Sequence, residues 1–232
     1  RLNGSTVAFY SPSGKYFAVL AHGDRLVLYD RMVNELAEIE NLTNAGANWG
    51  NSLVFSPDEK YLAFSKKDKT NEVIITLLPK LEVLQIFSSH TDDVTSVSFS
   101  PDGKILASSS DDSTVKIWKL SSGKFTELQT LKGHFDRISS VFFNPDGKFL
   151  ASGSFDKTIK IWKLSSGKFS ELQSLKHYNY KFGPVSFSPD GKFLTSACSG
   201  RTVKIWKLSS GKFTELQTLN LPVLKILYLL FS

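Results

Sequence analysis

Serine, histidine and aspartate recur together in this sequence, and they are the three residue types of a hydrolase triad. The two sets are His90, Ser108 and Asp112, and His134, Ser152 and Asp156. In such a triad the histidine takes the proton of the serine hydroxyl and the aspartate orients the imidazole. Here the set occurs twice, each time beside a tryptophan, with no G-x-S-x-G motif and no candidate oxyanion hole. This repetition argues against catalysis.

A third copy of the pattern is incomplete. Trp206 and Ser196 are present, but Gly200 stands where aspartate is expected. Tyr178 stands where histidine is expected, and His177 comes one place early. Such erosion is tolerable for packing and fatal for catalysis, so we expect a structural role and no enzyme activity.

Other signals of site chemistry are weak. The Ser-Ser-Gly-Lys turns lack the G-x-x-x-x-G-K-[ST] spacing of a phosphate loop and are better explained as hairpin turns. The four histidines have neither paired spacing nor cysteine partners. Cys198, the single cysteine, is best explained as a small buried hydrophobe, and it suits a reducing compartment. We therefore expect no metal and no cofactor.

The elements that hold these residues follow a repeat. The stretch KIWKLSSGKF occurs three times, which places Trp118, Trp162 and Trp206 44 residues apart. A second landmark, SPDGK or a close variant, recurs at intervals of 45, 44, 44 and 44 residues, with prolines at Pro12, Pro57, Pro101, Pro145 and Pro189. The sequence predicts five repeats in one domain, 1–232. The first two are degenerate, over about 1–89, and the next three are well formed, over about 90–219.

Each repeat has the pattern of four strands. In the third repeat the expected strands are Val94–Phe99, Lys104–Ser110, Thr114–Leu120 and Phe125–Leu131, rich in β-branched and aromatic residues. Pro-Asp-Gly, Asp-Asp-Ser and Ser-Ser-Gly separate them and are turn formers. A single antiparallel sheet of this kind leaves both apolar faces wet, whereas radial stacking into an all-β propeller covers both.

The residues at this point resemble the WD-repeat β-propeller family. The likeness rests on Gly133-His134, the SPDGK-like turns, Leu150-Ala151-Ser152-Gly153-Ser154, Asp156 and Trp162. It covers essentially the whole chain, strongly from His90 to Leu219. The namesake Trp-Asp pair is Trp-Lys in the three good repeats, and only Tyr29-Asp30 keeps an aromatic-Asp pair.

The resemblance implies a structural role for the recurring polar residues. In similar propellers a strand tryptophan donates to a serine hydroxyl, the hydroxyl meets a histidine, and the histidine donates to an aspartate in a turn. Carried over by position, the two tetrads are Trp118, Ser108, His90 and Asp112, and Trp162, Ser152, His134 and Asp156. Such a chain is costly, by roughly 1–3 kcal/mol for each orphaned group, when one member is lost.

The resemblance also implies a face that binds partners. Similar propellers bind peptides and proteins on the face whose loops enter the innermost strands, at positions three and five after the histidine and at the residue before the turn aspartate. The residues matched in this way are Trp49, Asn51, Asp93, Thr95, Asp111, Arg137, Ser139, Phe155 and Lys181. These positions differ between repeats while the turns and tryptophans do not, as expected of a constant scaffold with a varied binding face.

Trp49 has two interpretations. It lies outside the 44-residue series, so it either fills the core of an eroded repeat or stands exposed as a binding anchor. Binding hot spots are enriched in tryptophan, tyrosine and arginine, which favours Trp49 and Arg137 as anchors.

The last residues match the start of another repeat. The next landmark proline is due at position 233, so Ile226–Phe231 corresponds to the first strand of a sixth repeat, and 220–232 begins a further blade. The sequence favours a larger propeller of about seven blades, because family members commonly have seven. The alternative is a closed ring of five with the extra strand docked elsewhere.

Composition and charge leave three classes of function open. The chain has 41% hydrophobic residues, a net charge of +6 and no apolar window long enough to span a membrane. We expect a non-catalytic scaffold, cytoplasmic or nuclear, that binds proteins or peptides, with acidic ones among the candidates, within a larger assembly. The alternatives are a regulatory or ligand-sensing module of a larger enzyme or NTPase, and direct nucleic-acid binding. Lys116, Lys119, Lys124 and their copies favour a rim of charge over one stripe, which makes nucleic acid the weakest of the three.

Overall fold

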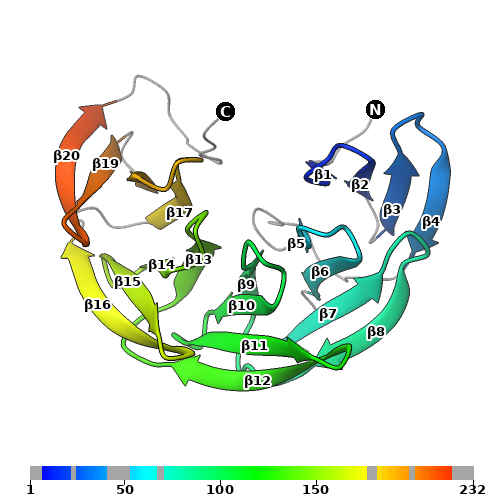
Figure 1. The fold of residues 1–232 in the computed structure, drawn as a ribbon, viewed down its shortest axis with the longest axis horizontal. Helices are drawn as coiled ribbons and strands as arrows, with labels where there is room; N and C mark the ends of the chain where they lie inside the picture. Colours follow the sequence, from blue (N-terminus) through cyan, green and yellow to red (C-terminus); the bar gives the residue numbers. More distant parts are fainter. Residues whose placement is uncertain are drawn as a thin grey trace. The chain divides into compact units, whose positions relative to one another are not determined.

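The computed structural model describes residues 7–21, 25–40, 53–66, 71–176, 182–198 and 202–220. It divides into two compact units, Arg1–Val94 and Thr95–Ser232. The described residues contain twenty strands and no helix, and hence no helix that could cross a membrane. The strands form five four-stranded antiparallel sheets, in each of which only consecutive strands pair (Figure 1). The predicted count of five four-stranded repeats is confirmed.

The first unit holds two sheets. Their strands are β1 (Val7–Tyr10), β2 (Tyr16–Ala21), β3 (Arg25–Asp30) and β4 (Glu35–Ile39), followed by β5 (Leu53–Phe55), β6 (Tyr61–Lys66), β7 (Glu72–Leu77) and β8 (Glu82–Phe87). Their shared core includes Leu28, Leu62 and Phe64, all of them fully buried. The degenerate repeats therefore keep the apolar alternation that a sheet needs, although the landmark tryptophan is absent.

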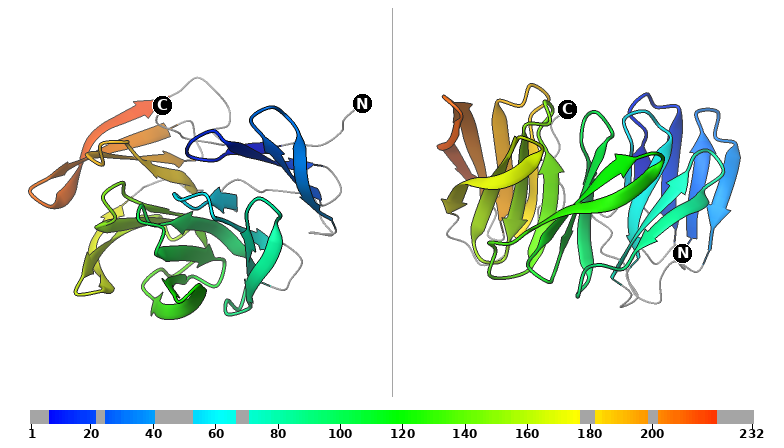
Figure 2. Two further views of the ribbon diagram at one scale, coloured as in Figure 1. Left: turned by 45° about the vertical axis from the view of Figure 1, so that its right-hand side comes forward. Right: turned by 60° about the horizontal axis from the view of Figure 1, so that its bottom comes forward.

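The second unit holds three sheets. The first has β9 (Val94–Phe99), β10 (Ile105–Ser110), β11 (Val115–Ser121) and β12 (Lys124–Leu131). The second has β13 (Ile138–Phe143), β14 (Phe149–Ser154), β15 (Thr158–Ser165) and β16 (Lys168–Lys176). The third has β17 (Phe182–Phe187), β18 (Phe193–Cys198), β19 (Thr202–Ser209) and β20 (Lys212–Asn220). The sheets that contain β13 and β17 lie side by side (Figure 2).

The SPDGK turns close the first hairpin of a sheet through side-chain hydrogen bonds. The Ser100 hydroxyl donates to the Asp102 carboxylate at 2.6 Å and accepts from the Ile105 N–H at 2.9 Å. Gly103 has a φ of 68°, a conformation that favours glycine. Because the turn satisfies its own backbone groups, the same kind of turn can serve in repeat after repeat.

Tryptophan and glutamine connect neighbouring sheets of the second unit. Trp162 packs in one cluster with Ala107 and Ile117 of the preceding sheet. The Gln129 amide donates to the Phe169 carbonyl at 2.7 Å and accepts from the Phe169 N–H at 2.9 Å. Gln173 makes the same pair of bonds to Phe213, at 2.7 and 3.0 Å. Each glutamine amide thus links two outer strands with the same pair of hydrogen bonds that a residue of a paired strand would make.

A β-bulge interrupts the ladder between β11 and β12. Ile117 lies opposite Gln129 and Trp118 opposite Glu127, so Leu128 is the extra residue on β12. The same shift occurs at Ile161/Trp162 and at Ile205/Trp206. A bulge increases the local twist, and here it falls next to the residue that packs on the neighbouring sheet.

Candidate functional site

The best-defined polar constellation lies within the sheet β13–β16. His134 precedes β13, Ser152 lies on β14, Trp162 lies on β15, and Asp156 lies in the turn between β14 and β15. The Trp162 indole N–H donates to Ser152 Oγ at 2.9 Å. His134 Nε2 lies 2.8 Å from Ser152 Oγ, and His134 Nδ1 lies 2.7 Å from Asp156 Oδ2. We call this chain of hydrogen bonds the relay.

One proton arrangement satisfies every member of the relay. The indole donates to the serine oxygen, the serine hydroxyl donates to Nε2 of a neutral imidazole, and the Nδ1–H donates to the carboxylate. Ser152 is fully buried and the His134 side chain is 0% exposed, so each bond replaces one to water. Leaving any of these buried groups without a partner carries the full cost of its desolvation.

Asp156 also holds the turn that carries it. Its Oδ1 accepts from the Thr158 hydroxyl at 2.6 Å and from the Thr158 N–H at 2.9 Å, and its Oδ2 also accepts from the Phe135 N–H. Burial would raise the pKa of this carboxyl, but the hydrogen bonds from His134 and Thr158 outweigh burial and hold the pKa well below its usual range. Asp156 is therefore ionised throughout the neutral range.

The relay has the contacts of a Ser-His-Asp triad, but its serine is buried within a sheet. Serine, imidazole and carboxylate stand in the order and at the distances that nucleophile activation needs. Ser152, however, lies in the middle of a four-stranded sheet with no exposed surface, and its oxygen already accepts the Trp162 indole. A substrate carbonyl has no approach to this hydroxyl while the sheet is intact. The geometry supports a structural role.

The other two copies show part of the same pattern. Trp118 donates to Ser108 at 3.0 Å, and Trp206 donates to Ser196 at 3.3 Å. Asp112 accepts from the Thr114 hydroxyl at 2.6 Å, as Asp156 does from Thr158. His90 is buried at the end of the first unit, and the other three members of its set belong to the second.

Arg137, Phe155 and Asp111 of the predicted binding face come from the loops at one end of the strands of the second unit. Arg137 precedes β13, and its side chain is 64% exposed. Its Nη1 lies 3.7 Å from Asp111 Oδ2, in the β10–β11 turn of the neighbouring sheet. Phe155, in the β14–β15 turn, is half-buried, and its N–H donates to the Arg137 carbonyl at 2.9 Å.

Phe135 belongs to this group although sequence reasoning missed it. It follows the relay histidine directly, and the residue is 91% exposed. Its backbone N–H is fixed by Asp156, so the ring projects from an ordered loop. The available signal was a large aromatic residue in a loop between two strands, at a position where the preceding repeat has Thr91. We call Phe135, Arg137, Phe155 and Asp111 the loop surface.

Two other predicted face residues are engaged in holding strands. The Thr95 hydroxyl donates to the Ile138 carbonyl at 2.6 Å and lies 3.0 Å from Ser109 Oγ. The Ser139 hydroxyl donates to the Gly153 carbonyl at 3.0 Å. Asp93 is half-buried in the first unit. Trp49, Asn51 and Lys181 lie outside the described residues, so both interpretations of Trp49 stay open.

The lysines of the repeats divide into two classes, which corrects the single rim expected from the sequence. Lys116, Lys160 and Lys204 turn inward and bind Glu127, Glu171 and Glu215, with Nζ–Oε distances of 3.0, 2.8 and 2.6 Å. The copies at the two other positions, those of Lys119 and Lys124, are exposed. Among the residues with assigned placement, no group of three or more histidine, cysteine, aspartate or glutamate side chains is arranged to hold a metal.

Comparison with known families agrees with the repeat. The family model described as WD domain, G-beta repeat, matches residues 81–119, 125–163 and 185–207. The first two matches start at the outer strand of one sheet and end in the third strand of the next, so the sequence repeat is offset from the sheet by one strand. A search of curated proteins found no match.

Proposed function

We propose that this chain, three segments of which match the WD-repeat family model, is a non-catalytic scaffold that binds partner proteins or peptides through the loop surface. WD repeats generally serve as interaction modules. The observation that carries the proposal is the 91% exposed Phe135 on a loop whose backbone is fixed by the buried relay. An aromatic ring held in this way can desolvate a partner's side chain at little cost in conformational entropy.

Arg137 adds a polar anchor to the same surface. Its contact with Asp111 is longer than a hydrogen bond and the Arg137 side chain is 64% exposed, so the contact stabilises the fold little. A partner carboxylate can replace Asp111 and take a bidentate bond from the guanidinium. One repeat earlier, Thr91 and Asp93 occupy the positions that correspond to Phe135 and Arg137. The aromatic and cationic anchors are therefore not shared with the preceding repeat.

The experiment compares a loop-surface variant with a matched control. Phe135→Ala/Arg137→Ala should abolish capture of the principal partner from native lysate, as measured by quantitative mass spectrometry against the wild-type chain. Each truncation of a hot spot costs about 2 kcal/mol or more of binding, whereas exposed positions change stability by less than about 0.5 kcal/mol. The melting temperature should therefore stay close to that of the wild type.

The control is Lys148→Ala/Ser166→Ala, two exposed residues in the β13–β14 and β15–β16 turns, at the opposite end of the same strands. It should capture the same partner as the wild-type chain. Unchanged capture by the loop-surface variant, with the control equal to it, contradicts the assignment of the loop surface.

We also propose that the sheets are blades of a β-propeller with more than five blades. Support comes from two faces that the repeat leaves uncovered. Phe55, Phe99, Phe143 and Phe187 are all buried, yet Tyr10 at the corresponding position is 72% exposed. Leu216, the counterpart of the partly buried Leu128 and Leu172, is 56% exposed.

A further inference from the structure

The β11–β12 hairpin ends in a patch of cations and hydroxyls. Lys119 lies opposite Thr126, and Ser121 lies opposite Lys124. Residues opposite each other in a ladder, and residues two apart on a strand, share one face of the sheet. These four side chains therefore lie together, with the two lysines as diagonal neighbours, less than about 8 Å apart at Cβ. All four are exposed.

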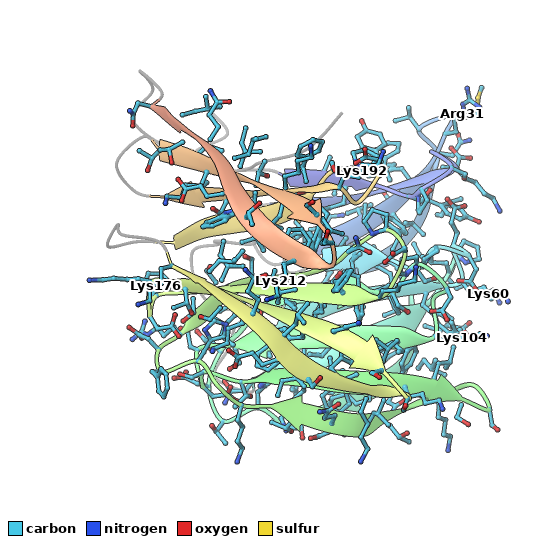
Figure 3. All side chains as sticks on the ribbon, turned by 60° about the vertical axis from the view of Figure 1, so that its left-hand side comes forward. Arg31, Lys60, Lys104, Lys176, Lys192 and Lys212 are labelled. Atoms are coloured by element: carbon cyan, nitrogen blue, oxygen red, sulfur yellow. The ribbon has the colours of Figure 1, made fainter. Side chains whose placement is uncertain are left out.

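The same patch recurs on the two following sheets. The register pairs Lys163 with Ser170 and Ser165 with Lys168 on β15 and β16, and Lys207 with Thr214 and Ser209 with Lys212 on β19 and β20. All eight of these side chains are exposed. Each patch, which we call a lysine quartet, has two ammonium groups and two hydroxyls. Figure 3 labels Lys212 at the start of β20.

The quartet lysines lack acidic partners within the described part of the chain. The repeated acids of the same outer strands, Glu127, Glu171 and Glu215, are bound to the inward lysines. The lysines of the SPDGK turns differ, because Lys148 and Lys192 lie 3.3 and 3.7 Å from the aspartates of their own turns. The turn lysines are thus balanced by neighbouring aspartates, whereas the six quartet lysines leave an excess of positive charge at the end of the sheets where these hairpins turn.

We infer that the three lysine quartets form a second interaction surface, which binds an acidic segment of a partner polypeptide. A carboxylate is an acceptor only, and each quartet offers ammonium and hydroxyl donors around one position. An extended segment rises about 3.3 Å per residue, so one chain can place carboxylates on several quartets, and weak contacts add through multivalency.

The composition of the quartets favours polypeptide over nucleic acid. All six cations are lysine, a compact point charge, and none is arginine, whose planar fork matches phosphate. Single-stranded nucleic-acid sites place aromatic rings for base stacking, and the quartets contain no aromatic residue. The β11–β12 turn lies at the opposite end of β11 from the β10–β11 turn that carries Asp111. The quartets are therefore separate from the loop surface, and their test is independent of it.

The test measures binding of fluorescein-labelled poly-L-glutamate to the full chain by anisotropy at low ionic strength. The variant carries Lys→Gln at positions 119, 124, 163, 168, 207 and 212. The control carries Lys→Gln at positions 104, 132, 148, 157, 176 and 192, six exposed lysines of the same unit outside the quartets, of which Figure 3 labels Lys104, Lys176 and Lys192. Both variants lose the same charge.

The quartet variant should bind at least about tenfold more weakly, which is the sum expected from six exposed ion pairs. The control should change by less than about threefold, because more distant charges are partly screened. Equal losses in the two variants would mean that only net charge matters and would overturn the inference. So would absent binding of poly-L-glutamate to the wild type, or tighter binding of a DNA duplex that depends on the same six lysines. Circular dichroism and melting temperature establish that both variants are folded.

Discussion

The carboxylate of Asp156 holds both the relay and its turn, so its loss should be costly. In Asp156→Asn an amide NH2 takes the place of one carboxylate oxygen, or the flipped amide displaces the other. A donor then faces the donors of His134 and Phe135 or of Thr158. We expect the free energy of unfolding in urea at pH 7 to fall by about 1–3 kcal/mol. Asp136→Asn, at an exposed position whose carboxylate accepts the Arg137 N–H at 2.8 Å, should change it by less than about 0.5 kcal/mol.

The same contact gives stability a dependence on pH. The pKa of Asp156 is lower in the folded chain than in the unfolded one, so its ionised form stabilises the fold at every pH above the unfolded value of about 4. This contribution decreases as the pH falls below that value towards the folded pKa. The difference in unfolding free energy between wild type and Asp156→Asn should therefore shrink on acidification. A difference that grows below about pH 4 would contradict the assignment.

Glutamine side chains join neighbouring sheets of the second unit by hydrogen bonds to backbone groups. Gln173→Ala removes both bonds to Phe213 and leaves the N–H and the carbonyl of a partly buried strand without those partners. We expect the free energy of unfolding to fall by about 1–3 kcal/mol, and Gln129→Ala to have a similar effect through Phe169. Thr126→Ala, on the exposed face of β12, serves as the control and should be nearly neutral. An equal loss in all three variants would mean that strand propensity, and not the glutamine bonds, is being measured.

Much of the strand and sheet structure was predictable from the sequence. The 44-residue period fixes which residues repeat, and the turn residues fix where strands end. The Trp162–Ser152 pair was expected only through the resemblance to the WD-repeat family, and the register then places Ser152 two residues from the direct partner of Trp162. The bulge that inserts Leu128 was not predictable, because it depends on the twist of the assembled sheet. Nor was the inward position of Lys116, which depends on its Glu127 partner across that bulge. The bonds of Gln129 reach 40 residues along the chain and join two sheets, beyond any local pattern.

For the whole molecule, the exposure of Tyr10 and Leu216 leads to a prediction of the number of blades. We expect class averages of the intact protein in negative-stain electron microscopy to show a closed ring with more than five blades. The physical reason is that the counterparts of these two residues within each unit are buried or partly buried, whereas exposing large apolar side chains to water is unfavourable. A closed ring of five blades in those averages would contradict the proposal.

The glutamine bonds between outer strands have a consequence for how such a chain changes over generations. Gln129 and Gln173 each bind the phenylalanine of an identical KIWKLSSGKF stretch in the next sheet, so every such junction has the same two surfaces. A genetic crossover between equivalent positions of two copies adds or removes one whole sheet and recreates a junction of the same kind. The array can therefore lengthen or shorten without a new interface having to evolve, and Phe135 and Arg137 travel with the sheet that carries them.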